Sequence, residues 1–260
     1  MTDLEDSLMK SKYELSRHRA IESVLSILNV DFIKAHGILF CGGTRLTLEN
    51  NEYRESLDID FVPKNLKLFS DLRQEFTKNG ARNLFIDEKM NANEISPVNE
   101  FRIDRYGIRF IVKTLCCPVK FEIFSEDRLS FSDAVFTGAG ELSIPATAMK
   151  DQFAAKFISN CDRVFDRSTF LKDFVDLSIL MNRYPELSNY AFRVASDIYG
   201  EKHIRASVSK GVQMMQGNGW AECIERLNIR SSSIASILNG SNSLINSQFG
   251  ESDDCHPGMS

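Results

Sequence analysis

The sequence contains little of what marks several large classes of protein. It has only six Pro and 14 Gly, which argues against a fibrous or largely disordered chain. No stretch approaches the roughly 18–20 continuous apolar residues that a membrane span needs. The opening residues, from Met1 to Asp6, are acidic where a secretory signal would be basic. We therefore expect a cytoplasmic protein with no membrane association.

Cysteine and histidine are also sparse, at six and four residues, and neither forms a metal-binding pattern. The cysteines are irregularly spaced and include no CxxC pair, and the histidines are scattered along the chain. This spacing argues against a zinc site. We interpret the adjacent Cys116 and Cys117 as structural thiols rather than as a redox pair.

The charge balance is slightly acidic. There are 31 Lys and Arg against 36 Asp and Glu, which gives a net charge of −5 and a pI near 5.5. This balance excludes a generally basic protein that coats nucleic acid, but it leaves room for a local basic patch. With 260 residues, 43% of them hydrophobic, the chain is long enough to bury a core without disulfides or a structural metal.

The hydrophobic pattern divides the chain into four parts. Residues 1–36 carry apolar side chains at three- and four-residue steps, which predicts one or two N-terminal helices. Residues 37–140 combine short apolar or alternating runs with one amphipathic stretch, which predicts a mixed α/β core. Residues 141–238 return to a helical pattern. Residues 239–260 are rich in Ser, Asn and Gly, and we expect a disordered or weakly packed tail there.

The predicted elements follow from periodicity and from turn residues. Strands are predicted at residues 37–41, 56–61 and 119–124, with a hairpin joining 101–103 to 108–112. Helices are predicted at residues 45–49, with Thr44 as the cap, and at 65–78, 146–160, 168–182, 185–199 and 213–227.

The most informative stretch runs from Cys41 to Phe61. Asp58 and Asp60 are two residues apart on a predicted strand, so both carboxylates share one face. Two such charges repel each other unless a cation lies between them, and hard divalent ions such as Mg²⁺ take these ligands together with substrate phosphates. Upstream, the turn at Gly42-Gly43 allows backbone N–H groups to approach a phosphate. The combination predicts a site for a metal-bound polyphosphate, whereas an isolated DxD pattern usually marks a solvated strand face.

This order of motifs resembles the nucleotidyltransferase superfamily related to DNA polymerase β. Within it, the sequence is similar to the AbiEii/AbiGii-type nucleotidyltransferase toxins of bacterial toxin–antitoxin and phage-defence systems. Those proteins typically carry a GGT turn and then an R-x-S-x-D-I-D-F-like strand. The matching residues here are Gly42-Gly43-Thr44 and Arg54-Glu55-Ser56-Leu57-Asp58-Ile59-Asp60-Phe61. The resemblance extends more loosely to about residue 181 and implies an α+β fold, in which a nucleotidyltransferase-like mixed sheet with flanking helices precedes a helical C-terminal domain.

The superfamily also has a third carboxylate on a later strand. Glu122, which alternates with apolar residues in the predicted strand at 119–124, is the natural counterpart. Asp104 and Glu100 are the alternatives, and an exposed strand face with a solvated Glu122 is the simpler interpretation.

The resemblance further implies a Lys on the first helix after the sheet, then an Arg, then an R-D-x-x-D-L-like helix. The corresponding residues are Lys156, Arg163 and the run from Lys172 to Leu177, in which Lys172 stands where the family usually has Arg. The second Asp of this motif is Asp176, to which we assign a site role. Asp173 and Asp176 share a helix face and could instead hold Lys156 or Arg54 in place.

The family activity is transfer of a nucleoside monophosphate from an NTP to an acceptor, with pyrophosphate leaving. For this chain the resemblance implies Mg²⁺, with Mn²⁺ as the alternative, held by Asp58, Asp60 and Glu122, which are also the expected catalytic residues. Glu122 could in addition deprotonate the acceptor hydroxyl. The expected nucleotide-binding residues are Gly42, Gly43, Thr44, Arg54, Lys156 and Asp176.

The acceptor is less constrained than the chemistry. We favour RNA, with the acceptor end of tRNA as the best candidate, and a growth-arresting toxin with a cognate antitoxin. The alternatives are transfer onto a small molecule, transfer onto a protein, and a nucleotide-binding module without catalysis.

Overall fold

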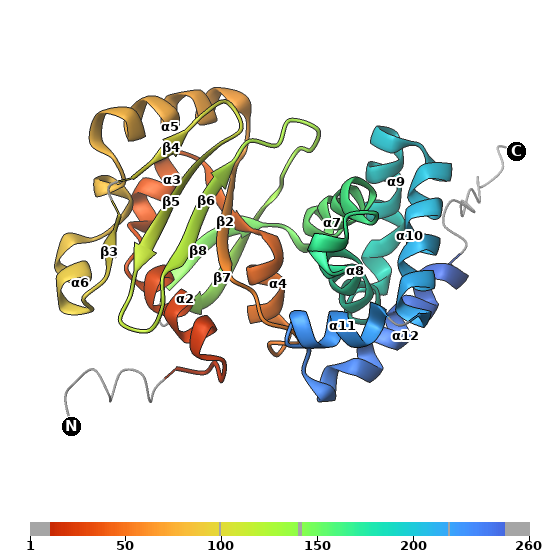
Figure 1. The fold of residues 1–260 in the computed structure, drawn as a ribbon. Coiled ribbons are helices and arrows are strands. Elements are labelled where there is room, and N and C mark those ends of the chain that lie inside the picture. Colours follow the sequence, from red (N-terminus) through yellow and green to blue (C-terminus); the bar gives the residue numbers. More distant parts are fainter. Residues whose placement is uncertain (1–10, 99, 140–141, 218, 248–260) are drawn as a thin grey trace, which may run out of the picture. The chain divides into compact units, whose positions relative to one another are not determined.

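The computed structural model describes residues 11–98, 100–139, 142–217 and 219–247 (Figure 1). These residues form two compact units. The first unit extends to Gln152 and also includes Ala221–Ile234, while the second consists of Phe153–Trp220 and the residues from Ala235 onward. The structure therefore divides the chain differently from the predicted boundaries at residues 140 and 238. Residues 221–234, expected in the helical domain, belong to the first unit.

A mixed sheet forms the centre of the first unit. The described strands are β1 (Ile38–Cys41), β2 (Asp58–Pro63), β3 (Ser96–Pro97), β4 (Arg102–Ile103), β5 (Gly107–Lys113), β6 (Val119–Phe124), β7 (Asp133–Ala139) and β8 (Leu142–Thr147). Their order is β3-β5-β6-β2-β1-β8-β7, with β4 pairing β5. The pairs β2–β6 and β1–β8 are parallel, and the other neighbours are antiparallel.

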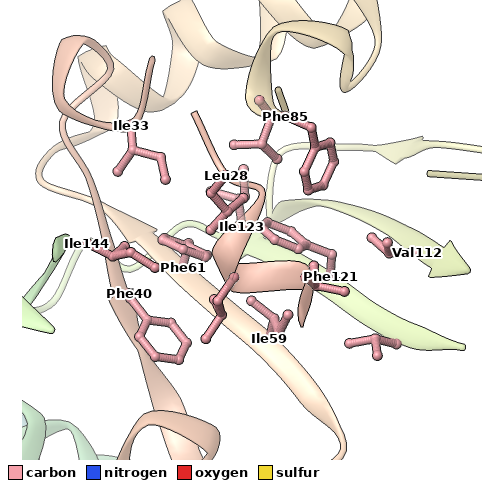
Figure 2. Packing of buried hydrophobic residues seen from close by; sticks show 14 of the residues in the cluster. Leu28, Ile33, Phe40, Ile59, Phe61, Phe85, Val112, Phe121, Ile123 and Ile144 are labelled. Carbon is pink, nitrogen blue, oxygen red and sulfur yellow. The ribbon is translucent and has the colours of Figure 1, made fainter. Parts of the chain in front are cut away.

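One face of this sheet is covered by helices and carries the core of the unit (Figure 2). The helices of the first unit are α2 (Ser16–Ser26), α3 (Val30–Ala35), α4 (Gly42–Glu49), α5 (Leu66–Asn79) and α6 (Asp87–Ala92). Phenylalanines from four neighbouring strands pack in a row on the covered face. The ring centroids are 5.4 Å apart for Phe40–Phe61, 5.3 Å for Phe61–Phe121 and 5.0 Å for Phe110–Phe121. Side chains alternate along a strand, so the residues between these phenylalanines point to the opposite face.

The sequence predicted several elements of the first unit correctly. Strands at 37–41 and 119–124, the hairpin around residue 105 and the helix at 65–78 are confirmed as β1, β6, β4–β5 and α5. Two details are wrong. The helix after β1 begins at Gly42 rather than at Arg45, with Cys41 as its N-cap, so Thr44 does not cap it. Strands β7 and β8 were not predicted, and β8 delays the start of the next helix to Met149.

Residues 221–234 join the first unit through the loop that connects α4 to β2. The backbone N–H of Glu55 donates to the Leu227 carbonyl at 2.8 Å, and the N–H of Arg230 donates to the Tyr53 carbonyl at 3.0 Å. The Arg230 guanidinium also donates to the Asn51 carbonyl at 3.3 Å. A segment that follows the second unit in sequence therefore completes a loop of the first.

The second unit is helical. The helices that contribute to it are α7 (Met149–Arg163), whose first turn belongs to the first unit, α8 (Lys172–Arg183), α9 (Ser188–Tyr199), α10 (Glu201–Gln216) and α12 (Ile234–Asn246), while α11 (Gly219–Arg226) continues into the first unit. The predicted helices at 168–182 and 185–199 are confirmed as α8 and α9. The predicted helix at 213–227 is instead the end of α10 followed by α11.

The expectation of a disordered tail from residue 239 is wrong for residues 239–246, which belong to α12. Ile237, Gly240, Ser241 and Leu244 are buried, at the three- and four-residue steps of a helix face. The abundance of Ser, Asn and Gly hid this periodicity. Residues 248–260 lie outside the described part of the chain. Within that part, no helix is both long enough and apolar enough to cross a membrane.

At Gly240, helix α12 packs directly against the backbone of α8. A Cβ at this position would overlap the backbone carbonyl of Ser178 on α8, which has no rotamer with which to move aside. We expect Gly240→Ala to lower the free energy of unfolding by about 1–3 kcal/mol, as overpacked sites do. Urea denaturation measures this change, with Asn242→Ala on the exposed side of the same helix as the control. Equal stability of the two variants would contradict the packing of α12 on α8.

Candidate active site

The opposite face of the sheet carries the carboxylates that the sequence singled out, and part of this face is also buried, at Leu39, Cys41 and Val62. Asp58 and Asp60 alternate along β2 with Ile59 and Phe61, which are fully buried on the covered face. Strand β6 pairs parallel to β2 and places Glu122 directly beside Asp60. The structure thus brings all three predicted metal ligands onto one face of two adjacent strands, as the predicted alternation required.

Two cations share this face and engage Glu122. Arg109 on β5 approaches Oε1 of Glu122 through Nε at 2.6 Å, and Lys120 approaches Oε2 through Nζ at 2.8 Å. Lys120 also lies 4.0 Å from Oδ2 of Asp58. Burial alone would raise the pKa of Glu122, but the hydrogen bond from Lys120 and the two positive charges outweigh it and lower that pKa. Glu122 is therefore held as a carboxylate.

The donor set fits a hard divalent ion in part. Asp58 and Asp60 present carboxylate oxygens from one strand face, and the Asp58 side chain is 39% exposed. Both oxygens of Glu122 are engaged by cations, so it would have to exchange one of them to bind a metal. In keeping with this, no three His, Cys, Asp or Glu side chains in the described ranges are already grouped to hold an ion. The assignment of Glu122 as third ligand stays a prediction.

The alternative third ligand Asp104 has another use. Its Oδ1 accepts hydrogen bonds from the N–H groups of Tyr106 and Gly107, at 2.8 and 3.0 Å, and closes the β4–β5 turn. Its carboxylate also pairs with Arg102 and Arg109. Asp104 is thus a turn-closing residue. For the other alternative, Glu100, the structure gives no contact that would bring it to the three carboxylates.

The glycine motif lies against the carboxylates. Gly42 begins α4 directly after β1, with φ +80°, a conformation that favours glycine. The carboxylate of Asp60 occupies the space into which a Cβ at position 42 would project. The Gly42 carbonyl accepts a hydrogen bond from the Gln152 amide at 3.0 Å. The predicted phosphate site at Gly42-Gly43 and the predicted metal site at Asp60 are therefore adjacent.

Thr44 and Arg54, two of the predicted nucleotide-binding residues, are both buried, whereas a side chain that binds a nucleotide needs access to it. The Thr44 hydroxyl is fully buried and hydrogen-bonded to Ser56 Oγ, at 2.8 Å, and to the Asp58 carbonyl. The Arg54 side chain is 3% exposed and donates to the Glu55 carbonyl at 2.8 Å. In this structure both residues fix the approach to β2, and their predicted binding of the nucleotide stays a prediction.

The sequence did not single out His18, which is fully buried on α2. Its Nε2 accepts the backbone N–H of Ser56 at 2.9 Å, and its Nδ1 lies 2.9 Å from Oε1 of Glu52. Since Nε2 accepts, the ring proton of the neutral imidazole is on Nδ1 and is donated to Glu52. One signal pointed to this histidine. It is a polar residue on the apolar stripe of α2, together with Ile21 and Leu25.

The remaining predicted residues lie in the second unit. Lys156 on α7 is 7% exposed and pairs with Asp173 at 3.0 Å and with Asp176 at 2.7 Å, both on α8. Arg163 also pairs with Asp173, at 2.8 Å. Of the two interpretations that the sequence left open, the geometry confirms that Asp173 and Asp176 hold Lys156. A role of Lys156 or Asp176 at the nucleotide stays a prediction.

The burial of His18 gives a pH dependence to stability. Burial lowers the pKa of His18 below its ordinary 6.5, and the hydrogen bond to Glu52 offsets only part of this effect. As the pH falls below 6.5, His18 is therefore protonated in the unfolded chain before it is protonated in the folded chain. The stabilisation is complete above this pH and is lost as the pH falls to the pKa of His18 in the folded protein. We expect the free energy of unfolding to fall between pH 7.5 and about 5.5, and to fall less in His18→Gln. Urea denaturation at both pH values tests this, and identical losses in the two proteins would refute it.

Comparisons with known proteins identify the family and the fold. The sequence model of the nucleotidyl transferase AbiEii toxin of type IV toxin–antitoxin systems matches residues 24–234. A solved structure of a candidate nucleotidyltransferase from H. pylori is similar at 17% identity and a TM-score of 0.54, over 90% of this chain and 96% of that one. JHP933 from Helicobacter pylori is similar at 16% identity and a TM-score of 0.51, over 93% and 92%. No curated protein matches the sequence significantly.

At these identities the two structures speak for the fold, and they confirm the predicted nucleotidyltransferase-like α+β architecture. The family match covers well over half of the chain, including the glycine motif, β2 and α8. The chain therefore belongs to the AbiEii family of nucleotidyltransferase toxins of type IV toxin–antitoxin systems.

Proposed function

We propose that this nucleotidyltransferase moves a nucleoside monophosphate from an NTP to RNA, with tRNA as the favoured acceptor. The observation that carries the proposal is the adjacency of two aspartates and a glycine-initiated helix. Asp58 and Asp60 project from the face of β2 opposite Ile59 and Phe61, and Asp60 lies against Gly42 at the start of α4. A triphosphate that binds the first N–H groups of α4 would thus bring its metal to the two aspartates.

The residues of the chain have separable roles in this proposal. The backbone at Gly42 and Gly43 binds the β- and γ-phosphates, and Asp58 and Asp60 hold Mg²⁺ or Mn²⁺. When bound, the ion would neutralise phosphate charge and polarise the reacting phosphoryl group. Glu122 suits a ligand or an ion-pair partner better than a general base, because its lowered pKa makes it a weaker proton acceptor.

The charge around the carboxylates supports a polyanionic substrate. In the register of the sheet, Arg102 on β4 is opposite Arg109, which is opposite Glu122, so the row continues from the carboxylates into two cations. The Arg102 side chain is 78% exposed. Arginines in such positions bind phosphates, whether of an NTP or of an RNA backbone. This local charge is compatible with the overall net charge of −5.

The match to a toxin–antitoxin family supports a cognate antitoxin as partner, and we further propose the cytoplasm as the site of action. Transfer onto a protein or a small molecule is the alternative to RNA, and nucleotide binding without turnover is the alternative to catalysis by this chain.

A labelling assay separates these functions. Purified protein is incubated with Mg²⁺ and each α-labelled NTP in turn, with total tRNA and cell lysate offered as acceptors.

In that assay we expect Asp58→Asn and Asp60→Asn each to lose at least about 100-fold in label transfer, because a neutral amide is a poor ligand for a hard divalent ion. Asp71→Asn, at an exposed position of α5, is the matched control and should transfer as the wild type does. Full transfer by either site variant would refute the site. Label on a protein band or a small molecule would keep the site and replace the acceptor.

Gly42 offers a test of the geometry at the helix start. Gly42 and Gly200 both have φ +80°, but a Cβ at Gly42 would meet the Asp60 carboxylate, whereas at Gly200 it would meet nothing within 4 Å. We expect both Ala variants to lose about 1–2 kcal/mol of stability from backbone strain. Only Gly42→Ala should lose transfer, by roughly tenfold or more, since its methyl group displaces Asp60. Equal activity of the two variants in the labelling assay would contradict this role.

A further inference from the structure

The position of Asp58 depends on an irregular loop, because residues 50–57 connect α4 to the start of β2. This loop contains Asn51 and Glu52 with φ of 59° and 49°, a conformation that non-glycine residues adopt at a cost. Such a loop keeps its shape only when surrounding contacts hold it. The contacts that hold it therefore also decide where Asp58 emerges.

Glu52 anchors one end of these contacts to helix α2. Glu52 is 4% exposed, and its Oε2 and Oε1 accept the backbone N–H groups of Glu14 and Leu15, at 2.8 and 3.1 Å. Oε1 also lies 2.9 Å from Nδ1 of His18. The beginning of α2 and the loop are thereby joined through one buried carboxylate.

His18 carries the connection from Glu52 to Ser56. With its Nδ1 proton directed to Glu52, the imidazole presents a lone pair on Nε2 to the backbone N–H of Ser56, at 2.9 Å. This orientation is fixed by two hydrogen bonds on opposite sides of the ring. At many metal sites the ligating histidine itself is oriented by a carboxylate in this way, whereas His18 binds a backbone N–H.

The last link runs from Ser56 to Asp58. The Thr44 hydroxyl is hydrogen-bonded both to Ser56 Oγ, at 2.8 Å, and to the backbone carbonyl of Asp58. The hydrogen bonds therefore form an unbroken chain from Glu52 through His18, Ser56 and Thr44 to the backbone of Asp58. Every side chain that forms this chain is at most 8% exposed.

We propose that His18 is a positioning residue for Asp58, which fixes the carboxylate for its metal through the backbone N–H of Ser56. The inference rests on the proposed metal role of Asp58. It makes the N-terminal helix α2 part of the active-site architecture. The competing interpretation is a buried histidine that stabilises the fold and has no effect on the carboxylate.

A pair of substitutions separates the two sides of the imidazole. The amide of Gln is as many bonds from Cα as Nε2, and the amide of Asn as many as Nδ1. His18→Gln therefore keeps an acceptor for the Ser56 N–H, whereas His18→Asn keeps only the contact with Glu52. Val24→Ala, a cavity at a fully buried position of the same helix, controls for lost stability.

Mn²⁺ binding by calorimetry is the main measurement. We expect His18→Asn to bind Mn²⁺ about tenfold or more weakly, as lost supporting hydrogen bonds do at metal sites, and His18→Gln and Val24→Ala to stay within about threefold of the wild type. Wild-type affinity in His18→Asn, or an equal loss in all three variants, would overturn the positioning role. Asp58→Asn, measured alongside, tests the proposed site separately, since Mn²⁺ binding that survives this substitution would contradict the site.

Hydrogen exchange of the Ser56 amide gives a second readout. It should remain protected in the wild type and in His18→Gln and lose protection in His18→Asn, and continued protection there would overturn the inference. If His18→Asn fails to fold, Thr44→Val removes the final link with little change of shape. It should then show the same loss of Mn²⁺ affinity, and an unchanged affinity would overturn the proposal.

Discussion

The alternation of side chains along β2 and β6 is the constraint on which the rest of the structure depends. Burial of Phe61 and Phe121 against the helices directs Asp60 and Glu122 to the opposite face of the sheet, because neighbouring side chains on a strand point in opposite directions. The hydrophobic core and the acidic face are therefore two results of one pattern. A shift of β2 by one residue would bury its aspartates and expose its phenylalanine, so the register of the core also protects the site.

Buried polar groups fix the positions of loops and helices that the pairing of strands does not determine. In the first unit, His18 is hydrogen-bonded to Glu52 and also accepts a hydrogen bond from the backbone N–H of Ser56, in the loop before β2. In the second unit, Lys156 lies between Asp173 and Asp176, where each buried charge has an opposite charge at hydrogen-bond distance. Such groups are costly to leave unpaired, so they fix conformations more sharply than apolar packing does. The residues that resemble the family motif therefore also hold helices α7 and α8 together.

The parts of the fold that can be predicted from the sequence are those determined by local periodicity. The period of two at residues 119–124 and the apolar run before Gly42 defined β6 and β1, and the spacing of Asp58 and Asp60 placed them on one face. Strand β8 could not be predicted in this way, because it depends on pairing with β1 and β7, which a short stretch of sequence does not indicate. Local periodicity does not reveal the structural roles of Thr44 and His18 for the same reason. Their hydrogen bonds to Ser56 join residues that are 12 and 38 positions apart.

The return of residues 221–234 to the first unit makes that unit discontinuous in sequence. The loop that precedes β2 donates a backbone hydrogen bond to Leu227 and accepts one from Arg230, and both of these residues follow the whole of Phe153–Trp220 along the chain. During synthesis, the residues of β2 leave the ribosome long before these partners do. The acidic face can therefore reach its final arrangement only after Leu227 and Arg230 have emerged, and a chain that stops before them lacks two of the hydrogen bonds that hold the loop before Asp58.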